Sequence, residues 1–514
     1  MLAKNFYYST FIVSLLSVFT ASISFLNQLV LARYFGTGAE MESYLVAVSL
    51  PVTFSGLISG MLNYLLVPAL QYAKRFDRGS EALTRSLALG LGSGATIIAL
   101  MGIATSDRLF MVLVPGLLPA QHAIAVELAH ITWLFLPISI LSAIYVAGLH
   151  VKKKFAVSTF LLSWPIIGSI VVCLIAPSQF GVRAVAWGQL LGYISMVGTL
   201  RFIHGSSQAG WDWTGLRQVL ANFPQAIAAG LIFVLYPFSD AFWGSRIGPG
   251  TVPYLGYAQR LLVGFSGLAV VGLTTVLFPR LAQHAMEGKA EALRNELGTC
   301  MRIMLICMVP GATAFSMLAT PSVQLLFQRG SFHLKDTITL GTLLPVMLFG
   351  MVAMSCTGLI FKALFARQES GMAGALSVSG AFVYFSLSGL LGSWLGIIGI
   401  GIAYAVSWWL VFGFGVVYLW REVPIIKQLY GNYRFVLQLV EASLLVALVC
   451  WLGGQFLPSE TSSDNIRRLL VVAATWISAC ATYLGFCHHF PALPELGLIR
   501  KRVLPYAGHQ NFIT

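Results

Sequence analysis

Apolar stretches of about 20 residues recur along the whole chain, and this feature restricts the fold more than any other. A helix of about 20 apolar residues crosses the roughly 30 Å of hydrocarbon in a bilayer. Of the 514 residues, 57% are hydrophobic and 10% are charged, whereas a soluble domain carries about 25% charged residues. Membrane β-strands alternate polar and apolar residues over short segments, unlike these continuous runs. The sequence therefore predicts an all-α polytopic membrane protein.

The apolar pattern predicts about fourteen transmembrane helices. The first run is too long for the core of a signal peptide, and no clear cleavage site follows it, so we expect a retained helix. We place the spans over residues 8–32, 43–72, 84–105, 123–149, 155–176, 181–203, 219–243, 254–279, 298–320, 338–364, 370–393, 397–420, 435–457 and 466–487.

The basic residues are distributed unevenly between the loops. A net charge of +13 would suggest nucleic acid in a soluble protein, but here Lys and Arg concentrate in alternate short loops. Examples are Lys152-Lys153-Lys154 and the tail Arg500-Lys501-Arg502. Cytoplasmic loops carry this excess in membrane proteins. The pattern predicts a multi-pass protein of a bacterial inner membrane with both termini in the cytoplasm, and no nucleic-acid partner.

An internal repeat at an offset of 211 residues predicts two halves. Residues 54–57 (FSGL) recur as residues 265–268, and each copy follows a glycine-rich loop, at 36–38 and 248–250. An offset of six helices preserves orientation, so the halves form a parallel repeat, and transporters place the substrate path between such halves. We expect an N-terminal lobe over 1–210, a second lobe over 211–425, and a helix pair with a basic tail over 426–514.

Several short motifs carry a family resemblance. They are residues 31–38 (LARYFGTG), 67–68 (VP), 257–261 (YAQRL), 277–279 (LFP), 326–332 (LFQRGSF) and 365–369 (FARQE). In this order and spacing the sequence resembles the MurJ/MviN family of lipid II flippases, within the MATE-like multidrug/oligosaccharidyl-lipid/polysaccharide (MOP) superfamily.

The resemblance implies a fold and a substrate. Two lobes would form a V around a central cavity, and the last two helices would offer a groove to a lipid tail. Cationic residues in the cavity would hold the head group of a polyprenyl-diphosphate-linked saccharide during alternating access. Aligned on Arg33, however, two family arginine positions become Ala21 and Asn27, and a third falls near Ser55. This departure keeps open lipid II or an exopolysaccharide repeat unit as the saccharide.

Four residues are candidates for substrate binding. Arg260 is the one family cavity arginine that clearly remains, and guanidinium binds phosphate through paired hydrogen bonds. A snorkelling arginine or a structural partner of Asp240 would be the alternative. Asn27, Gln28 and Ser55 offer neutral donors and acceptors for sugar hydroxyls, although helix–helix hydrogen bonds need the same groups.

Three charged residues are candidates for ion coupling or gating. Asp240 lies inside a predicted span, where an ionisable side chain is expensive and often functional. It either binds a proton or cation or forms a structural salt bridge. Glu42 follows Arg33 across a glycine turn, and we predict an outer gate there, with Arg246 as one possible partner of Glu42. A solvated loop charge is the alternative.

The sequence contains no nucleotide loop, nucleophile motif or metal-ligand spacing, so we predict a protein that is not an enzyme and has no cofactor or metal. The seven cysteines form no C-x-x-C pair. Membrane lipids are expected partners, and glycan-synthesis enzymes are candidates. Two alternative functions stay open: a cation-coupled MATE-type exporter of small molecules, and a non-transporting scaffold of a glycan-synthesis complex.

Overall fold

The structure is a computed structural model that describes residues 2–75, 80–152, 154–205, 210–221, 223–267, 290–367, 369–420, 433–457 and 465–489. Within these ranges the regular elements are helices, and there is no β-strand. Ten of the described helical segments are long and apolar enough to cross a membrane. The prediction of an all-α polytopic membrane protein is confirmed, while the count of fourteen spans stays a prediction. The motif at 277–279 and the basic tail at 500–502 lie outside the described residues.

The chain divides into two compact units. The first comprises Met1–Gln259, Phe327–Asp336 and Ser370–Ile400, and the second comprises Arg260–Leu326, Thr337–Glu369 and Gly401–Thr514. The boundaries of the predicted lobes remain a prediction. The first unit contains α1 (Leu2–Phe35), α2 (Ala39–Arg75), α3 (Ser80–Leu113), α4 (Pro119–Thr132), α5 (Phe135–Val151), α6 (Phe155–Leu161), α7 (Trp164–Ile175), η1 (Ser178–Phe180), α8 (Arg183–His204), α9 (Trp213–Ala221), α10 (Phe223–Ile247) and α15 (Ser370–Leu395).

Prolines break two of the predicted spans. The span predicted over 123–149 is interrupted between α4 and α5, and the one over 155–176 between α6 and α7. A proline removes an N–H donor, and its ring clashes with the carbonyl four residues earlier. Pro137 and Pro165 each stand just after an interruption. The carbonyl of Trp133, four residues before Pro137, accepts the Leu136 N–H at 3.2 Å instead.

Glycines allow α7 and α8 to pack closely. A Cβ added at Gly188 of α8 would lie 2.4 Å from the Gly168 carbonyl oxygen of α7, and one at Gly192 would lie 2.5 Å from the Trp164 oxygen. Small residues at such positions let helix backbones approach each other in membranes, where lipid removes most of the hydrophobic drive for association. The same unit holds α10, which packs against both α2 and α15.

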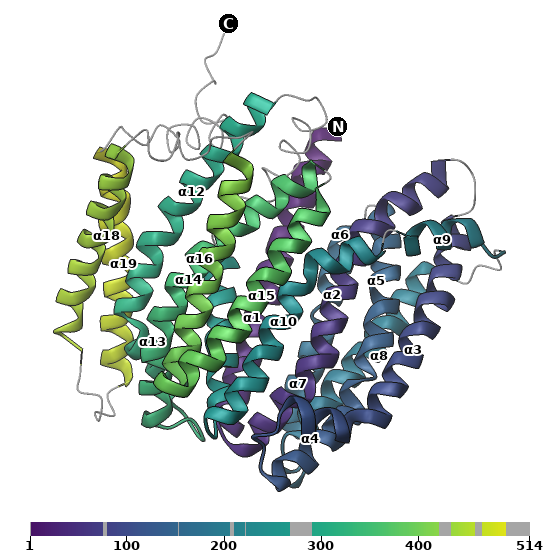
Figure 1. Ribbon diagram of the computed structural model, residues 1–514, viewed down its shortest axis with the longest axis horizontal. Coiled ribbons are helices and arrows are strands. Elements are labelled where there is room, and N and C mark those ends of the chain that lie inside the picture. Colours follow the sequence, from purple (N-terminus) through teal and green to yellow (C-terminus); the bar gives the residue numbers. More distant parts are fainter. Residues whose placement is uncertain are drawn as a thin grey trace, which may run out of the picture. The chain divides into compact units, whose positions relative to one another are not determined.

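The second unit contains the C-terminal helix pair. Its helices are α12 (Ala290–Met317), α13 (Ala319–Phe327), α14 (Leu334–Ala366), α16 (Ile397–Trp420), α18 (Tyr433–Gly454) and α19 (Asn465–His489), of which α13, α14 and α16 extend by a few residues into the first unit. Figure 1 shows α18 and α19 as adjacent antiparallel helices, and both pack against α12. Ala314 of α12 and Leu318, which lies between α12 and α13, form a buried cluster with Val446 and Cys450 of α18 and Ala479 of α19.

The two repeat loops contact each other within the first unit. Gly36 and Gly250 both have positive φ, at 54° and 80°, a conformation that glycine adopts without steric cost. A Cβ added at Gly250 would lie 3.3 Å from the carbonyl oxygen of Thr37. A helix begins shortly after each loop, α2 at residue 39 and a helix over 251–267. These two glycines are 214 residues apart and so are not equivalent positions at the offset of 211; the internal repeat stays a prediction.

Candidate functional site

Two of the sequence motifs pack against each other through glycine. The Ser331 N–H donates to the Arg33 carbonyl at 3.0 Å, and the Ser331 hydroxyl donates to the Tyr34 carbonyl at 3.0 Å. Gly36 and Gly330 lie at the contact: an added Cβ would be 2.2 Å from Ser331 O in one case and 2.2 Å from Arg33 O in the other. Only glycine permits this approach, because real Cβ atoms do not come that close. The loop before α2 is therefore joined to a segment 297 residues away.

A third motif completes the contact. The Tyr257 hydroxyl donates to the Gly36 carbonyl at 2.9 Å, and Tyr257 is 1% exposed. Its ring lies 5.5 Å from the ring of Phe327 and 5.8 Å from that of Phe332. Buried aromatic rings in these offset and edge-on arrangements contribute packing energy beyond their apolar area. Motifs at 31–38, 257–261 and 326–332 thus form one cluster in the first unit.

A buried carboxylate joins the same segments. Asp336 is 6% exposed. Its Oδ1 accepts the Thr37 hydroxyl at 2.8 Å and the Tyr254 hydroxyl at 2.7 Å, and its Oδ2 accepts the His333 N–H at 2.7 Å. Hydrogen bonds to an ionised acceptor are roughly twice as strong as neutral ones. We call this whole contact the latch: residues 33–37, Glu42, 250–257 and 327–336.

Glu42, a predicted gating residue, belongs to the latch. Its carboxylate is 2% exposed. Gln121 of α4 donates to it at 3.0 Å, and the Gly250 N–H donates at 3.2 Å. It is therefore not a solvated loop charge. The proposed partner Arg246 lies over the ring of Phe242 at 3.6 Å and donates to that residue's carbonyl at 3.0 Å.

Asp240 lies in a second polar cluster, inside α10. The side chain is 6% exposed. The Tyr384 hydroxyl of α15 donates to one carboxylate oxygen, and the Gln259 amide donates to the other. Tyr384 is fully buried and stacks on Tyr236 at 4.3 Å. A carboxylate on α10 that accepts bonds from two other helices in an apolar surrounding is a group whose protonation affects how those helices pack.

The predicted substrate-binding residues do not form one described cluster. Arg260 is half-buried on the helix over 251–267, one residue after Gln259. Asn27 of α1 accepts the Ser169 hydroxyl of α7 at 3.1 Å, a bond between helices. Gln28 is half-buried on α1. Ser55 is 3% exposed and donates to the Pro51 carbonyl of its own helix at 2.6 Å. Arg33 has an exposed side chain and contributes its carbonyl to the latch.

Sequence reasoning missed Asp336, Tyr254 and Tyr384. Asp336 stands in the first turn of α14, where stabilisation by the helix dipole explains an acidic residue without further contacts. Tyr384 lies in an apolar run and resembles an ordinary aromatic of a membrane helix. The one signal for Asp336 was its position four residues after the end of the 326–332 motif.

The fold is that of MOP-superfamily transporters. It is similar to a solved MATE-family multidrug transporter in an inward-facing conformation, with a TM-score of 0.65 and 16% identity over 81% of this chain and 99% of that one. It is also similar to a solved lipid II flippase MurJ in an inward closed conformation, with a TM-score of 0.75 and 18% identity over 96% of this chain and 99% of that one.

The family follows from sequence comparison. The family described as "Lipid II flippase MurJ" matches residues 31–463. A relative with that name from Burkholderia cenocepacia is 24% identical over 486 residues, which cover 89% of this chain and 92% of the relative. A probable lipid II flippase MurJ from Rhizobium meliloti is 24% identical over 93% of this chain and 92% of its own length. The chain belongs to the lipid II flippase MurJ family, as the motifs predicted.

Proposed function

We propose that this chain is a flippase that moves a polyprenyl-diphosphate-linked saccharide from the cytoplasmic to the outer leaflet of a bacterial inner membrane. The observation that carries the proposal is the family match over residues 31–463. The saccharide enters from the cytoplasmic side, its tail stays in lipid, and alternating access exposes the head group outside. The protein performs no covalent chemistry, and both termini lie in the cytoplasm.

The latch is the outer gate of this cycle. Its loops fall on the extracytoplasmic side according to the distribution of Lys and Arg. Outward opening separates residues 33–37 from 250–257 and 327–336, which breaks the bonds that Ser331, Tyr257 and Asp336 make to residues 33–37. Glu42 acts in the gate through Gly250, and Arg33 acts through its backbone. Each of these bonds contributes little net free energy, because water can replace the lost partner. The loops can therefore separate at a modest total cost.

Asp240 couples the cycle to a proton or cation. Its carboxylate connects α10, α15 and the helix over 251–267 through Tyr384 and Gln259. Protonation of this carboxylate, or an ion bound to it, weakens its hydrogen bonds to Tyr384 and Gln259. The relative stability of the inward- and outward-facing arrangements of these helices changes as a result. Arg260 follows Gln259 directly in the chain and anchors the diphosphate. Gln28, Asn27 and Ser55 are weaker candidates for sugar contacts, since Asn27 and Ser55 bond within the protein.

Lipid II is the first candidate for the substrate, because the relatives are named for it. An exopolysaccharide repeat unit is the second, because Ala21, Asn27 and Ser55 are neutral where the family carries arginine. A MATE-type exporter explains less of the chain: the likeness to the MATE transporter covers 81% of it, against 96% for the flippase. A non-transporting scaffold would have no use for a gate built from breakable bonds.

Complementation tests the proposal. The resident lipid II flippase of a bacterium is depleted, and this chain is expressed in its place at a membrane level checked by immunoblot. We expect growth to be rescued, lost in Arg260→Ala and partly kept in Arg260→Lys. Arg108→Ala serves as a control, because Arg108 is an exposed arginine on α3. No rescue by a well-expressed chain would exclude lipid II, and loss of an exopolysaccharide in a deletion strain would then identify the second substrate.

A further inference from the structure

A proline inside α12 leaves one backbone carbonyl without its helical partner. Pro310 stands within the helix, and the carbonyl four residues earlier belongs to Ile306. In a regular helix the N–H of residue 310 would donate to this oxygen, but proline has no N–H. An unsatisfied carbonyl is costly in hydrocarbon, where no water replaces the lost bond. The freed oxygen therefore requires a donor from another part of the chain.

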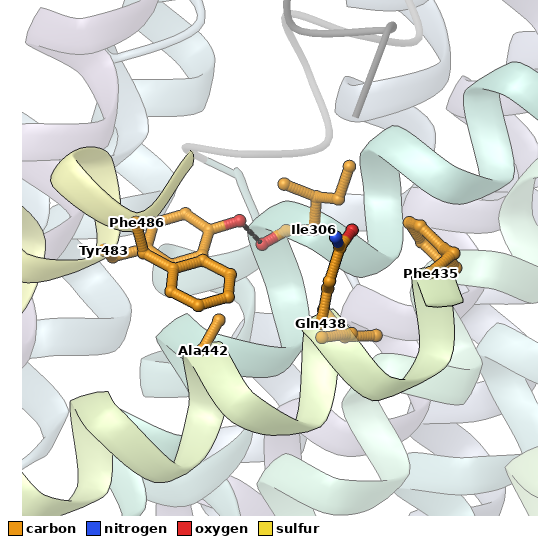
Figure 2. Close-up of a pocket in the computed structure, with 7 residues that line it drawn as sticks. Ile306, Phe435, Gln438, Ala442, Tyr483 and Phe486 are labelled. Carbon is orange, nitrogen blue, oxygen red and sulfur yellow. Dashed lines mark hydrogen bonds between the residues drawn. The ribbon is translucent and has the colours of Figure 1, made fainter. Parts of the chain in front are cut away.

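Tyr483 of α19 supplies that donor. Its hydroxyl donates to the Ile306 carbonyl at 2.6 Å, across 177 residues of sequence (Figure 2). The tyrosine ring packs against the apolar clusters that join α12 to the C-terminal pair, which include Phe435 and Leu439 of α18. Neutral hydrogen bonds in such apolar surroundings are not exchanged for bonds to water. The bond is thus a specific polar interaction among the apolar side chains that join α12 to the C-terminal helix pair.

The link borders a small pocket. Ile306, Tyr483, Phe435, Ala442 and Phe486 line it together with Gln438 and Leu439 (Figure 2). The Gln438 Oε1 atom is buried there without a hydrogen-bond partner. Apart from Gln438, whose side-chain amide is the other donor among the lining residues, the walls are apolar. Sliding α19 along α12 would therefore remove the Tyr483 bond from the Ile306 carbonyl.

We propose that Tyr483 is a positioning residue that ties the C-terminal helix pair to the proline break of α12. This bond fixes the position of α19 along the axis of α12. The helix pair α18–α19 therefore moves together with α12 during transport. Prolines are where membrane helices bend, so the tie joins the pair to the point of α12 where bending is expected. This role deepens the proposed flippase function and rests on it.

The chemistry of the tie can be tested without transport. Tyr483→Phe keeps the ring and removes the hydroxyl, and we expect it to lower the apparent melting temperature of the full chain in nanodiscs, by an amount equivalent to about a tenfold change in folding equilibrium. In the Pro310→Ala background the helix itself donates to Ile306, so removing the hydroxyl is expected to cost little. Ser478→Ala, which deletes an exposed hydroxyl on the same helix, is the control. Equal costs of Tyr483→Phe with and without Pro310 would overturn the assignment of this bond.

The positioning role needs a geometric readout. Cys307 on α12 and Cys480 on α19 are both exposed and can carry spin labels once the other cysteines are replaced. We expect a narrow distance distribution that Tyr483→Phe broadens and Ser478→Ala leaves unchanged. In vesicles, Tyr483→Phe is expected to lower the maximal transport rate per folded molecule several-fold, with an unchanged half-saturating substrate concentration.

Two results separate this proposal from the one it rests on. An unchanged distance distribution, or an unchanged rate per folded molecule in a chain that transports, would overturn the tie. Absence of transport by the wild-type chain would count against the flippase function alone, since the distance measurement decides the position of α19 independently.

Discussion

Gly36→Ala tests the latch most sharply, because a single methyl group meets a backbone atom there. Gly36 has φ +54°, and an added Cβ would lie 2.2 Å from the Ser331 carbonyl oxygen. A left-handed conformation costs a residue with a Cβ about 1–2 kcal/mol. The two loops must also separate, which strains the Ser331 bond to Arg33 and the Tyr257 bond to Gly36. Each lost bond costs about 0.5–1.5 kcal/mol, so the closed latch should weaken by about 2–5 kcal/mol in total.

Hydrogen exchange measured by mass spectrometry reports this weakening directly. The Ser331 N–H is protected by its bond to Arg33, so peptides covering 327–336 should exchange slowly in the wild type. In Gly36→Ala the exchange should be at least about thirtyfold faster, since every 1.4 kcal/mol is a factor of ten. Gly56→Ala is the matched control, because a Cβ at Gly56 meets nothing within 4 Å. If both variants exchange at the wild-type rate, the Gly36 contact does not hold the loops together, and the reasoning fails.

Three further substitutions have expected outcomes. Asp336→Asn replaces one carboxylate oxygen with an amide donor, so the side chain loses an acceptor for Thr37, Tyr254 or His333. Hydrogen exchange of the peptides covering 327–336 should become about tenfold faster. An unchanged rate would show that this carboxylate is dispensable. Asp240→Asn keeps the shape but removes the ionisable group. Transport in vesicles should lose its response to an imposed ion gradient, whereas a retained response would place coupling elsewhere. Gln438→Leu removes a buried, unpartnered acceptor and should raise the apparent melting temperature in nanodiscs; a lower value would indicate a partner for the amide.

Much of the fold could be predicted because hydrophobicity along the chain decides it. Where the structure describes them, the predicted ranges lie mostly on helices, including 370–393 within α15 and 466–487 within α19, and the spans over 123–149 and 155–176 are interrupted. The interruption before Pro165 was also foreseeable, since proline breaks helices for a local reason. These features depend on residues close together in the sequence.

The site was harder to predict because its contacts join distant residues. The motif at 31–38 is visible in the sequence, but no neighbouring residue indicates that Gly36 contacts Ser331. Nor does any local pattern indicate that Asp336 accepts a hydrogen bond from Thr37, which is 299 residues away in the chain. Asn27 illustrates a different difficulty, a polar residue with two equally plausible partners. Its side chain was open to a sugar or to a neighbouring helix, and the structure shows a bond to Ser169. Residue type alone cannot choose between such partners.

Glu42 shows which of its contacts the sequence could not indicate. The residue was expected at a gate beside a glycine loop, and it lies at the contact between two loops. A basic partner was considered because a charge pair is the simplest arrangement for an acidic residue. The structure provides an amide side chain, Gln121, and the backbone N–H of Gly250. Backbone donors leave no signature in the sequence, so this part of the site could not be foreseen.

Under the proposed function, the chain moves a polyprenyl-diphosphate-linked saccharide across the membrane. The most direct measurement reconstitutes the purified full chain in vesicles that hold fluorescent lipid II on one leaflet, and follows access of a membrane-impermeant reagent from the other side. We predict time-dependent transfer that requires the protein and falls in Arg260→Ala, with Arg108→Ala at the wild-type rate. If folded and inserted protein transfers neither lipid II nor a polyprenyl-diphosphate-linked exopolysaccharide unit, that result would contradict the flippase function.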